Sequence, residues 1–137
     1  MAGMESEVLR LTTGDRLTTD ITGAVARFCA DKGDGLCSVF VPHATAGVAI
    51  FETGSGTEED LELILESMLP RGARFAHRHG SPGHGRDHVL PAFISPSLVI
   101  PVLDGRLTLG TWQSVVFVDS NVDNPQREVR LSFLASA

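Results

Sequence analysis

The C-terminal part of the sequence, from Ser97 onward, consists of short β-type segments separated by turn residues. Runs of this kind, rich in Val, Ile, Leu and Phe, are typical of β-strands. The expected strands are Ser97–Leu103, Arg106–Leu109, Gln113–Asp119 and Glu128–Leu134. Asp104-Gly105 predicts a tight hairpin between the first two strands, and Asp123-Asn124-Pro125 predicts a further turn. This pattern favours a sheet whose strands are largely antiparallel.

The N-terminal part mixes further strands with helices. A cap at Thr19 or Asp20 and apolar residues at helical spacing predict a first helix that ends near Lys32. A second helix is predicted to begin at Thr57, with three acidic residues in its first turn, and to stop before Pro70. The remaining expected elements are the strands Glu5–Thr12, Leu36–Val41 and Gly47–Phe51 and a short helical piece, His88–Ile94, capped by Asp87. We therefore predict one α+β domain over residues 1–137, with six or seven strands and two clear helices.

Composition excludes several classes of protein. The formal net charge is −6, from eleven Lys+Arg against seventeen Asp+Glu, and no basic run is present. A general nucleic-acid binder is therefore not expected. No apolar run approaches the roughly 18 to 20 residues that cross a bilayer, and the first residues lack a signal-peptide core, so we expect a cytoplasmic protein without membrane contact. Cys29 and Cys37 lie in apolar segments without Cys-x-x-Cys spacing, which favours two buried thiols over a redox or metal site.

The five histidines all lie between His43 and His88, and four of them lie in the segment from His77 to His88. This segment contains many Gly and His residues and almost no apolar ones, which predicts a loop over the surface or around a site. Any one of these histidines is more often a surface residue than a ligand, but their clustering favours at least one functional site. A structural zinc site would normally use cysteine, whereas three imidazoles with an open fourth position fit a catalytic metal.

The segment Val41–Glu52 also has the features of an anion-binding site. His43, Thr45 and the backbone amides near Ala46-Gly47 follow a predicted strand and are suited to hold an anion such as phosphate. Gly47 would permit close approach of a ligand to the backbone. Glu52 is either a surface acid at a strand end or a carboxylate delivered into the same cleft.

The sole tryptophan, Trp112, lies between two predicted strands and is followed by Gln113. A single tryptophan is more often part of the core than a platform for a ligand. The role of Gln113 is left open by its position alone.

In chain order, VPHATAGVAIFE, Phe75–His77, His88 and Asp104–Gln113 (DGRLTLGTWQ) resemble the YjbQ family. This is a family of small, mostly uncharacterised proteins, often labelled secondary thiamine-phosphate synthase. The resemblance runs from about Glu5 to Phe133. It implies an α+β fold built on a largely antiparallel β-sandwich of six to eight strands with two or three helices, and a homotrimer. It also implies a divalent metal, zinc being the expected ion, bound through His43, His77 and His88.

The sequence departs from the family pattern in several places. Phe51 stands where the family usually has Asn before the Glu that corresponds to Glu52. Gly54-Ser55-Gly56 replaces an Asp-Pro pair that is common in the family. Near the C-terminus the family favours a basic Pro-Arg pattern, and here only Arg127 can correspond to its arginine. His79 and His84 match no family histidine and are interpreted as exposed residues without a function.

Two functions follow from these patterns. As a transferase, the protein would join a pyrimidine pyrophosphate to a thiazole phosphate, so that its partner is a small phosphorylated molecule. The metal and Arg127 would stabilise phosphate charge, and His43 or Glu52 would move protons. The residues expected to bind substrate are Thr45, Gly47, Trp112, Gln113 and Arg127. The alternative is a non-catalytic, trimeric module that binds phosphate or a metabolite; a purely structural trimer is the third possibility.

Overall fold

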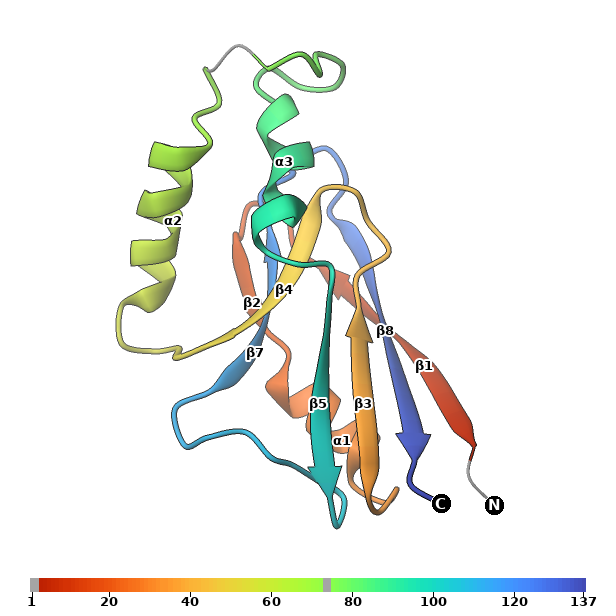
Figure 1. Cartoon of the computed structure of the whole chain (residues 1–137). Coiled ribbons are helices and arrows are strands. Elements are labelled where there is room, and N and C mark those ends of the chain that lie inside the picture. Colours follow the sequence, from red (N-terminus) through yellow and green to blue (C-terminus); the bar gives the residue numbers. More distant parts are fainter. Residues whose placement is uncertain (1–2, 73–74) are drawn as a thin grey trace.

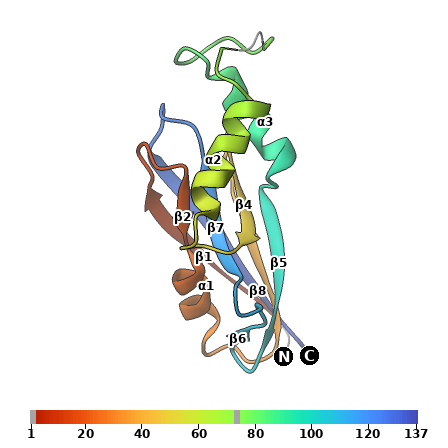
Figure 2. The same cartoon turned by 90° about the vertical axis from the view of Figure 1, so that its left-hand side faces the viewer.

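Two antiparallel sheets face each other; two of the described helices cover the outer side of the smaller sheet, and the third packs into the core between the sheets (Figures 1 and 2). The structure is a computed structural model that describes residues 3–72 and 75–137. Over these ranges the elements are β1 (Met4–Thr12), β2 (Thr18–Asp20), α1 (Thr22–Cys29), β3 (Gly35–Phe40), β4 (Ala46–Phe51), α2 (Thr57–Met68), α3 (Gly85–Phe93), β5 (Ser97–Leu103), β6 (Arg106–Leu107), β7 (Ser114–Asp119) and β8 (Gln126–Ala135). None of the helices described is long and apolar enough to cross a membrane.

The larger sheet has the strand order β1-β8-β3-β5-β6, and the smaller has the order β2-β7-β4. Neighbouring strands are antiparallel throughout. The prediction of one α+β domain with an antiparallel β-sandwich is therefore confirmed, with eight strands and three helices among the described residues. The hairpin at Asp104-Gly105 is also confirmed, because both residues have positive φ (53° and 73°), as a two-residue type I′ turn requires.

Strand β7 explains how two hydrophobic clusters form on the two sides of the small sheet. Side chains alternate along a strand, so Val115 and Phe117 enter the core between the sheets. Val116 and Val118 point the other way and pack with Leu65 of α2 and other residues of α2 and α3. The continuous apolar sequence of β7 is thus the result of burial on both faces.

Helix α1 completes the core between the sheets with Val25, Phe28 and Cys29. The expected cap at Thr19 or Asp20 is wrong, since Ile21 takes the N-cap position without a side-chain cap; Asp20 Oδ1, one residue earlier, still accepts a hydrogen bond from the backbone N–H of Thr22 (2.9 Å). The expected cap at Thr57 is wrong. Thr57 is the first helical residue of α2, and the preceding Gly56, with φ 97°, takes the N-cap position.

Helix α3 begins at Gly85, three residues before the predicted start at His88. His84 is its N-cap, and Asp87, expected as a cap, is fully buried inside the first turn. Asp87 accepts a hydrogen bond from Ser120 Oγ (2.6 Å), which ties α3 to the segment after β7. The Gly-rich start of this helix carries no capping side chain, which is why the sequence pattern placed the helix too late.

Both cysteines are buried free thiols, as predicted. Burial raises the pKa of Cys29, and it raises the pKa of Cys37 to about 12. Because the thiolate is the form that binds metals and attacks electrophiles, the structure gives these residues a packing role.

The outer face of the large sheet carries an apolar row that crosses four strands. Met4 pairs with Leu134, Leu134 with Leu36, and Leu36 with Pro101. Met4, Leu36 and Leu134 are exposed, as are Phe40, Val99 and Leu103 on the same strands. We call these residues together the outer apolar row.

Candidate functional site

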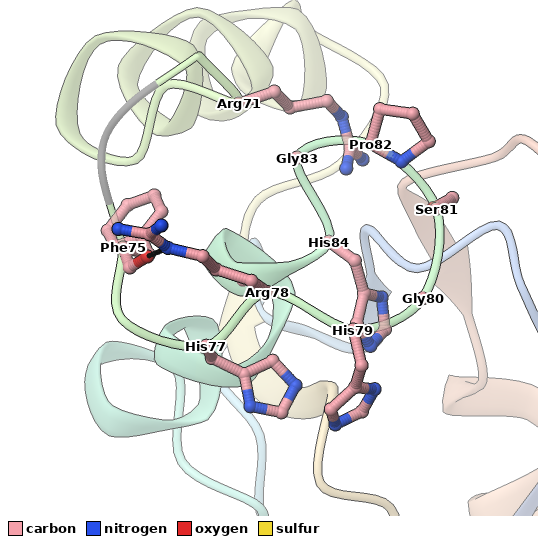
Figure 3. A pocket seen from close by; sticks show the side chains of 11 residues that line it. Arg71, Phe75, His77, Arg78, His79, Gly80, Ser81, Pro82, Gly83 and His84 are labelled. Atoms are coloured by element: carbon pink, nitrogen blue, oxygen red, sulfur yellow. Dashed lines mark hydrogen bonds between the residues drawn. The ribbon is translucent and has the colours of Figure 1, made fainter.

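The loop between α2 and α3 surrounds an open pocket of about 700 Å³, at the end of the molecule opposite the two termini (Figures 1 and 3). We call it the loop pocket. Its lining residues are Arg71, Phe75, His77, Arg78, His79, Gly80, Ser81, Pro82, Gly83, His84 and Gly85. The lining includes two arginines and three histidines. Among the residues that the structure describes, no acidic residue belongs to the lining.

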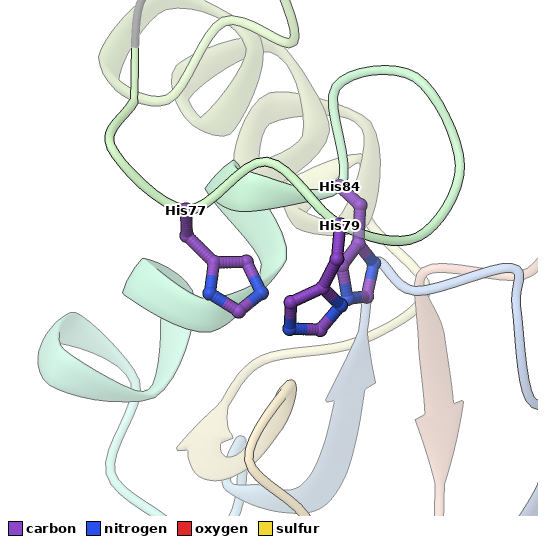
Figure 4. Close-up of side chains that lie close together, drawn as sticks. All are labelled: His77, His79 and His84. Carbon is purple, nitrogen blue, oxygen red and sulfur yellow. The ribbon is translucent and has the colours of Figure 1, made fainter.

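Three of the histidines converge at one wall of the loop pocket. In the described structure, one nitrogen each of His77, His79 and His84 lie within 4.8 Å of one another (Figure 4). His88 lies beside them, with its ring centre 3.9 Å from that of His77. We call His77, His79, His84 and His88 the histidine cluster.

His84 is the buried member of this cluster, and only 6% of it is exposed. The interpretation of His84 as an exposed loop residue is therefore wrong. Its Nε2 lies 2.8 Å from Nε2 of His88, one helical turn further along, so the two rings share a face of α3. His79 is exposed, as expected, but its ring centre lies 3.9 Å from that of His77.

Carboxylates lie behind His84. Its Nδ1 is 3.2 Å from Asp123 Oδ2 and 3.4 Å from Asp87 Oδ2. Asp123 also accepts a hydrogen bond from the backbone N–H of Ser81 (3.1 Å), which lowers its pKa and keeps the carboxylate charged. A carboxylate next to Nδ1 favours the tautomer with its proton there, and this leaves the Nε2 lone pair directed toward the other rings.

The loop is shaped around these rings. Gly80 has φ 86°, and a Cβ at this position would lie 2.7 Å from Cδ2 of His84. A Cβ on Gly85 would lie 2.5 Å from the carbonyl oxygen of His77. Glycine at both positions therefore lets the backbone pass close enough to bring the histidines together.

Two imidazoles of the cluster, those of His77 and His88, have lowered pKa values that favour the neutral form. Burial lowers the pKa of His77, and the nearby His79 and His84 lower it further. Burial also lowers the pKa of His88, with His77, His84 and His79 acting in the same direction. Neutral imidazole is the form of histidine that binds metal ions.

His43 is not a member of the group of converging nitrogens in the residues described. Its Nε2 accepts a hydrogen bond from the backbone N–H of Glu128 (2.9 Å). Its pKa is lowered by burial and by the charge of Arg127. The structure thus brings together His77 and His88 of the expected metal ligands, and places His43 beside β8; its role as a ligand stays a prediction.

Thr45 and Arg127 belong to a buried hydrogen-bond network. The Arg127 guanidinium donates to both oxygens of Asp119 (2.7 and 3.1 Å) and to Thr45 Oγ1 (2.8 Å). Asn121 Nδ2 also donates to Thr45 Oγ1 (3.2 Å). These contacts give both predicted phosphate ligands a structural role, and their binding of substrate stays a prediction.

Gly47 is also buried in packing. A Cβ there would lie 2.0 Å from the carbonyl oxygen of Ile94, so the glycine permits close contact between β4 and the segment after α3. That observation accounts for the glycine without a ligand.

Glu52, Trp112 and Gln113 lie at the other end of the small sheet. Ala46 pairs with Asp119 and Phe51 pairs with Ser114, so Thr45 and Glu52 are separated by the length of β4, about 20 Å. Trp112 is 73% exposed, which excludes a core role. Gln113 Oε1 accepts a hydrogen bond from the N–H of Gly110 (2.8 Å) and stabilises its own turn. One chain therefore does not bring these residues to the histidine cluster.

Four lining residues were missed as candidates: Arg71, Arg78, His79 and His84. Arg71 follows α2 and Pro70, and no sequence pattern marked it as a ligand. The spacing of four between His84 and His88 was the available signal, because it places two side chains on one face of a helix.

A divalent metal fits the histidine cluster. Nε2 of His77 is buried and has no hydrogen-bond partner among the described residues. Three imidazoles that converge within 4.8 Å are a typical donor set for zinc with an open coordination position.

Comparisons with known proteins agree with the fold. A family model described as "UPF0047 protein YjbQ-like" matches residues 7–136. A UPF0047 protein of Mycobacterium tuberculosis is 58% identical over 131 residues, which are 96% of this chain and 98% of that protein. A UPF0047 protein of Archaeoglobus fulgidus is 33% identical over 122 residues, covering 88% of this chain and 95% of that protein.

Solved structures give the same result. A YbjQ-like protein of unknown function from Sulfolobus solfataricus superimposes with a TM-score of 0.92 at 22% identity, covering 99% of this chain and 100% of that one. A hypothetical protein from Aeropyrum pernix has a TM-score of 0.86 at 33% identity, covering 96% and 99%.

Proposed function

Because this chain belongs to the UPF0047 family of YjbQ-like proteins, we propose that it binds a small phosphorylated molecule in the loop pocket and catalyses a transfer of the thiamine-phosphate synthase type. In that reaction the nitrogen of a thiazole phosphate forms a C–N bond to the methylene carbon of a pyrimidine pyrophosphate. The C–O bond to pyrophosphate breaks, and pyrophosphate leaves with the electron pair.

The observation that carries this proposal is the charge of the loop pocket. Arg71 donates from Nη2 to the carbonyl oxygen of Ser120 (2.6 Å) and from Nη1 to Asp87 Oδ2 (3.4 Å), which together hold its guanidinium in the lining of the pocket. Arg78 donates from Nε to the carbonyl oxygen of Phe75 (3.3 Å) and is exposed. Guanidinium groups bind phosphate oxygens in bidentate fashion, so these two residues suit a phosphate or pyrophosphate group.

These positions assign different roles to the arginines and to the histidines. Arg71 and Arg78 bind and orient the phosphate groups, and the imidazoles of the histidine cluster accept protons or hold the metal. The divalent ion, with zinc as the expected metal, would add positive charge where the leaving pyrophosphate becomes more negative.

One observation favours the alternative, a binding module without catalysis. Glu52 and Trp112, expected to move protons and to support a heteroaromatic ring, lie at the opposite end of the small sheet from the loop pocket. A single chain then offers phosphate binding without the acid and the aromatic platform, unless another subunit supplies them.

We include the homotrimer in this proposal. The outer apolar row supports it, because soluble monomers rarely expose contiguous apolar surface of this kind. Glu128 and Arg130 lie on the same exposed face of β8 and carry opposite charges, which suits a surface that packs against copies of itself. A cytoplasmic location is also proposed, supported by the free thiols Cys29 and Cys37.

The test combines binding with turnover. We expect pyrophosphate to bind the wild-type protein in calorimetric titrations, and Arg78→Gln to weaken that binding roughly 10-fold, since a hydrogen bond to a charged group contributes about 1.5–3 kcal/mol. Arg106→Gln, in β6, is the matched control and should bind as wild type does. Thiamine phosphate formed from the two substrates supports the transferase; binding without product supports the module. Absence of pyrophosphate binding would contradict both functions.

A further inference from the structure

We infer that His77, His79 and His84 are the metal ligands of this protein, a set that includes the two histidines outside the family pattern and leaves out His43. The inference adds a ligand set to the proposed function. It rests on that function only for what the metal does in the reaction, because the metal site itself is defined by these side chains. Its first basis is convergence: three nitrogens lie within 4.8 Å of one another.

The separations suit one small ion. Two imidazole nitrogens bound to a tetrahedral zinc at about 2.0–2.1 Å lie about 3.3 Å apart. The nitrogens would have to move closer together to reach that spacing; His79 is exposed and His77 half-buried, and both rings project from the same side of the loop (Figure 4). The ion would then sit among lining residues of the loop pocket.

The second basis is an unpaired polar atom. Nε2 of His77 is buried and has no hydrogen-bond partner in residues 3–72 and 75–137. A buried polar atom without a partner destabilises the folded protein, and natural proteins seldom retain one without a use for it. A metal ion would give this nitrogen the partner it lacks.

The third basis is the support behind His84. Ligating histidines commonly donate their second ring N–H to a carboxylate, which fixes the ring and raises its basicity. Nδ1 of His84 lies 3.2 Å from Asp123 Oδ2 and 3.4 Å from Asp87 Oδ2, near enough for a small adjustment to form this hydrogen bond, which the described structure does not yet contain, and its Nε2 lies beside His88. The buried Asp87 is held in turn by Ser120, so this support is rigid.

His88 completes the arrangement without being needed as one of the three ligands. Its Nε2 is 2.8 Å from Nε2 of His84, so one of the two nitrogens donates a hydrogen bond to the other. An ion bound to His84 Nε2 would replace this hydrogen bond. His88 would then be free to interact with a bound phosphate or to act as a fourth nitrogen.

The test is zinc binding by the full chain after removal of metals, measured by calorimetry and by the visible spectrum of the cobalt-substituted protein. We expect one ion per chain and a tetrahedral or five-coordinate cobalt spectrum. His79→Gln and His84→Gln should each weaken zinc binding at least about 10-fold, whereas the control His43→Gln should change it by less than about 2-fold. His79 is exposed, so its variant is expected to fold even if the His84 variant does not, and thermal melts will check both.

The inference is overturned if wild-type protein binds no zinc, or if His43→Gln weakens binding while His79→Gln does not. A parallel titration with pyrophosphate separates this result from the proposed function. Zinc binding without pyrophosphate binding would contradict the function alone, and pyrophosphate binding without zinc binding would contradict the metal site alone.

Discussion

Nε2 of His84 and Nε2 of His88 lie 2.8 Å apart, across one turn at the start of α3. This contact fixes the base of the histidine cluster to a helix, while His77 and His79 approach from the preceding loop (Figure 4). The site therefore combines a rigid half, supported by Asp87 and Ser120, with a half that depends on the path of the loop.

Gly80 controls that path. We expect Gly80→Ala to displace His84, since the new Cβ would lie 2.7 Å from its ring, and to lower zinc affinity at least about 10-fold. Gly14→Ala is the matched control: its φ of 59° gives similar backbone strain, about 1 kcal/mol, with nothing within 4 Å of the added Cβ. Equal zinc affinity of the two variants would show that Gly80 does not position the ligand.

We predict that Arg127 stabilises the folded protein. Replacement of Arg127 by Met would leave Asp119 buried without its ion-pair partner, and we expect a loss of about 3–5 kcal/mol in the free energy of unfolding. Urea denaturation measures this, with Arg130→Met on the exposed face of the same strand as control. A loss below about 1 kcal/mol, together with weaker pyrophosphate binding, would instead support Arg127 as a phosphate ligand.

His43 gives the stability a pH dependence of known sign. Its pKa in the folded protein is lowered by burial and by Arg127, with Asp119 and Glu128 opposing this effect. Below about pH 6.5 the unfolded chain therefore binds a proton that the folded protein does not, and stability decreases as the pH falls toward the folded pKa. The protonated ring would also lose its hydrogen bond from Glu128.

The measurement is the free energy of unfolding of metal-free wild type and His43→Gln between pH 8 and 5. The advantage of wild type over the variant should shrink as the pH falls. An advantage that grows, or an NMR titration of His43 above pH 6.5, would contradict the assigned environment.

We predict that the outer apolar row forms the contact between chains of the trimer. Leu36→Glu places a charge in the middle of the row, next to Leu134 and Pro101, and should dissociate a trimer into 14.6 kDa chains. Light scattering coupled to size exclusion measures the mass. Leu63→Glu, at an exposed position of α2, is the control and should leave the trimer intact. A monomeric wild type, or a Leu36→Glu variant that stays trimeric, would contradict this interface.

The fold was largely predictable because its signals are local. Asp104-Gly105 specifies a hairpin by its turn chemistry, and the apolar run of β7 specifies a strand buried on both faces. The start of α3 was not predictable in the same way. His84 is its N-cap without a capping side-chain hydrogen bond, and the burial of Asp87 depends on Ser120, a residue distant in the sequence.

The site was only partly predictable for a related reason. The clustering of histidines in one loop pointed to the right region, but which of them converge depends on the positive φ of Gly80 and on contacts with Asp123. The same limit applies to Arg127, whose chemistry suits phosphate but whose guanidinium is bound to Asp119 in the folded chain.

The most direct test of this account is a crystal structure of the zinc-soaked protein with anomalous scattering measured at the zinc edge. We predict one strong peak within about 2.0–2.1 Å of a nitrogen from each of His77, His79 and His84. A peak at His43, or no peak at the histidine cluster, would contradict the assignment of the loop pocket as the metal-dependent site.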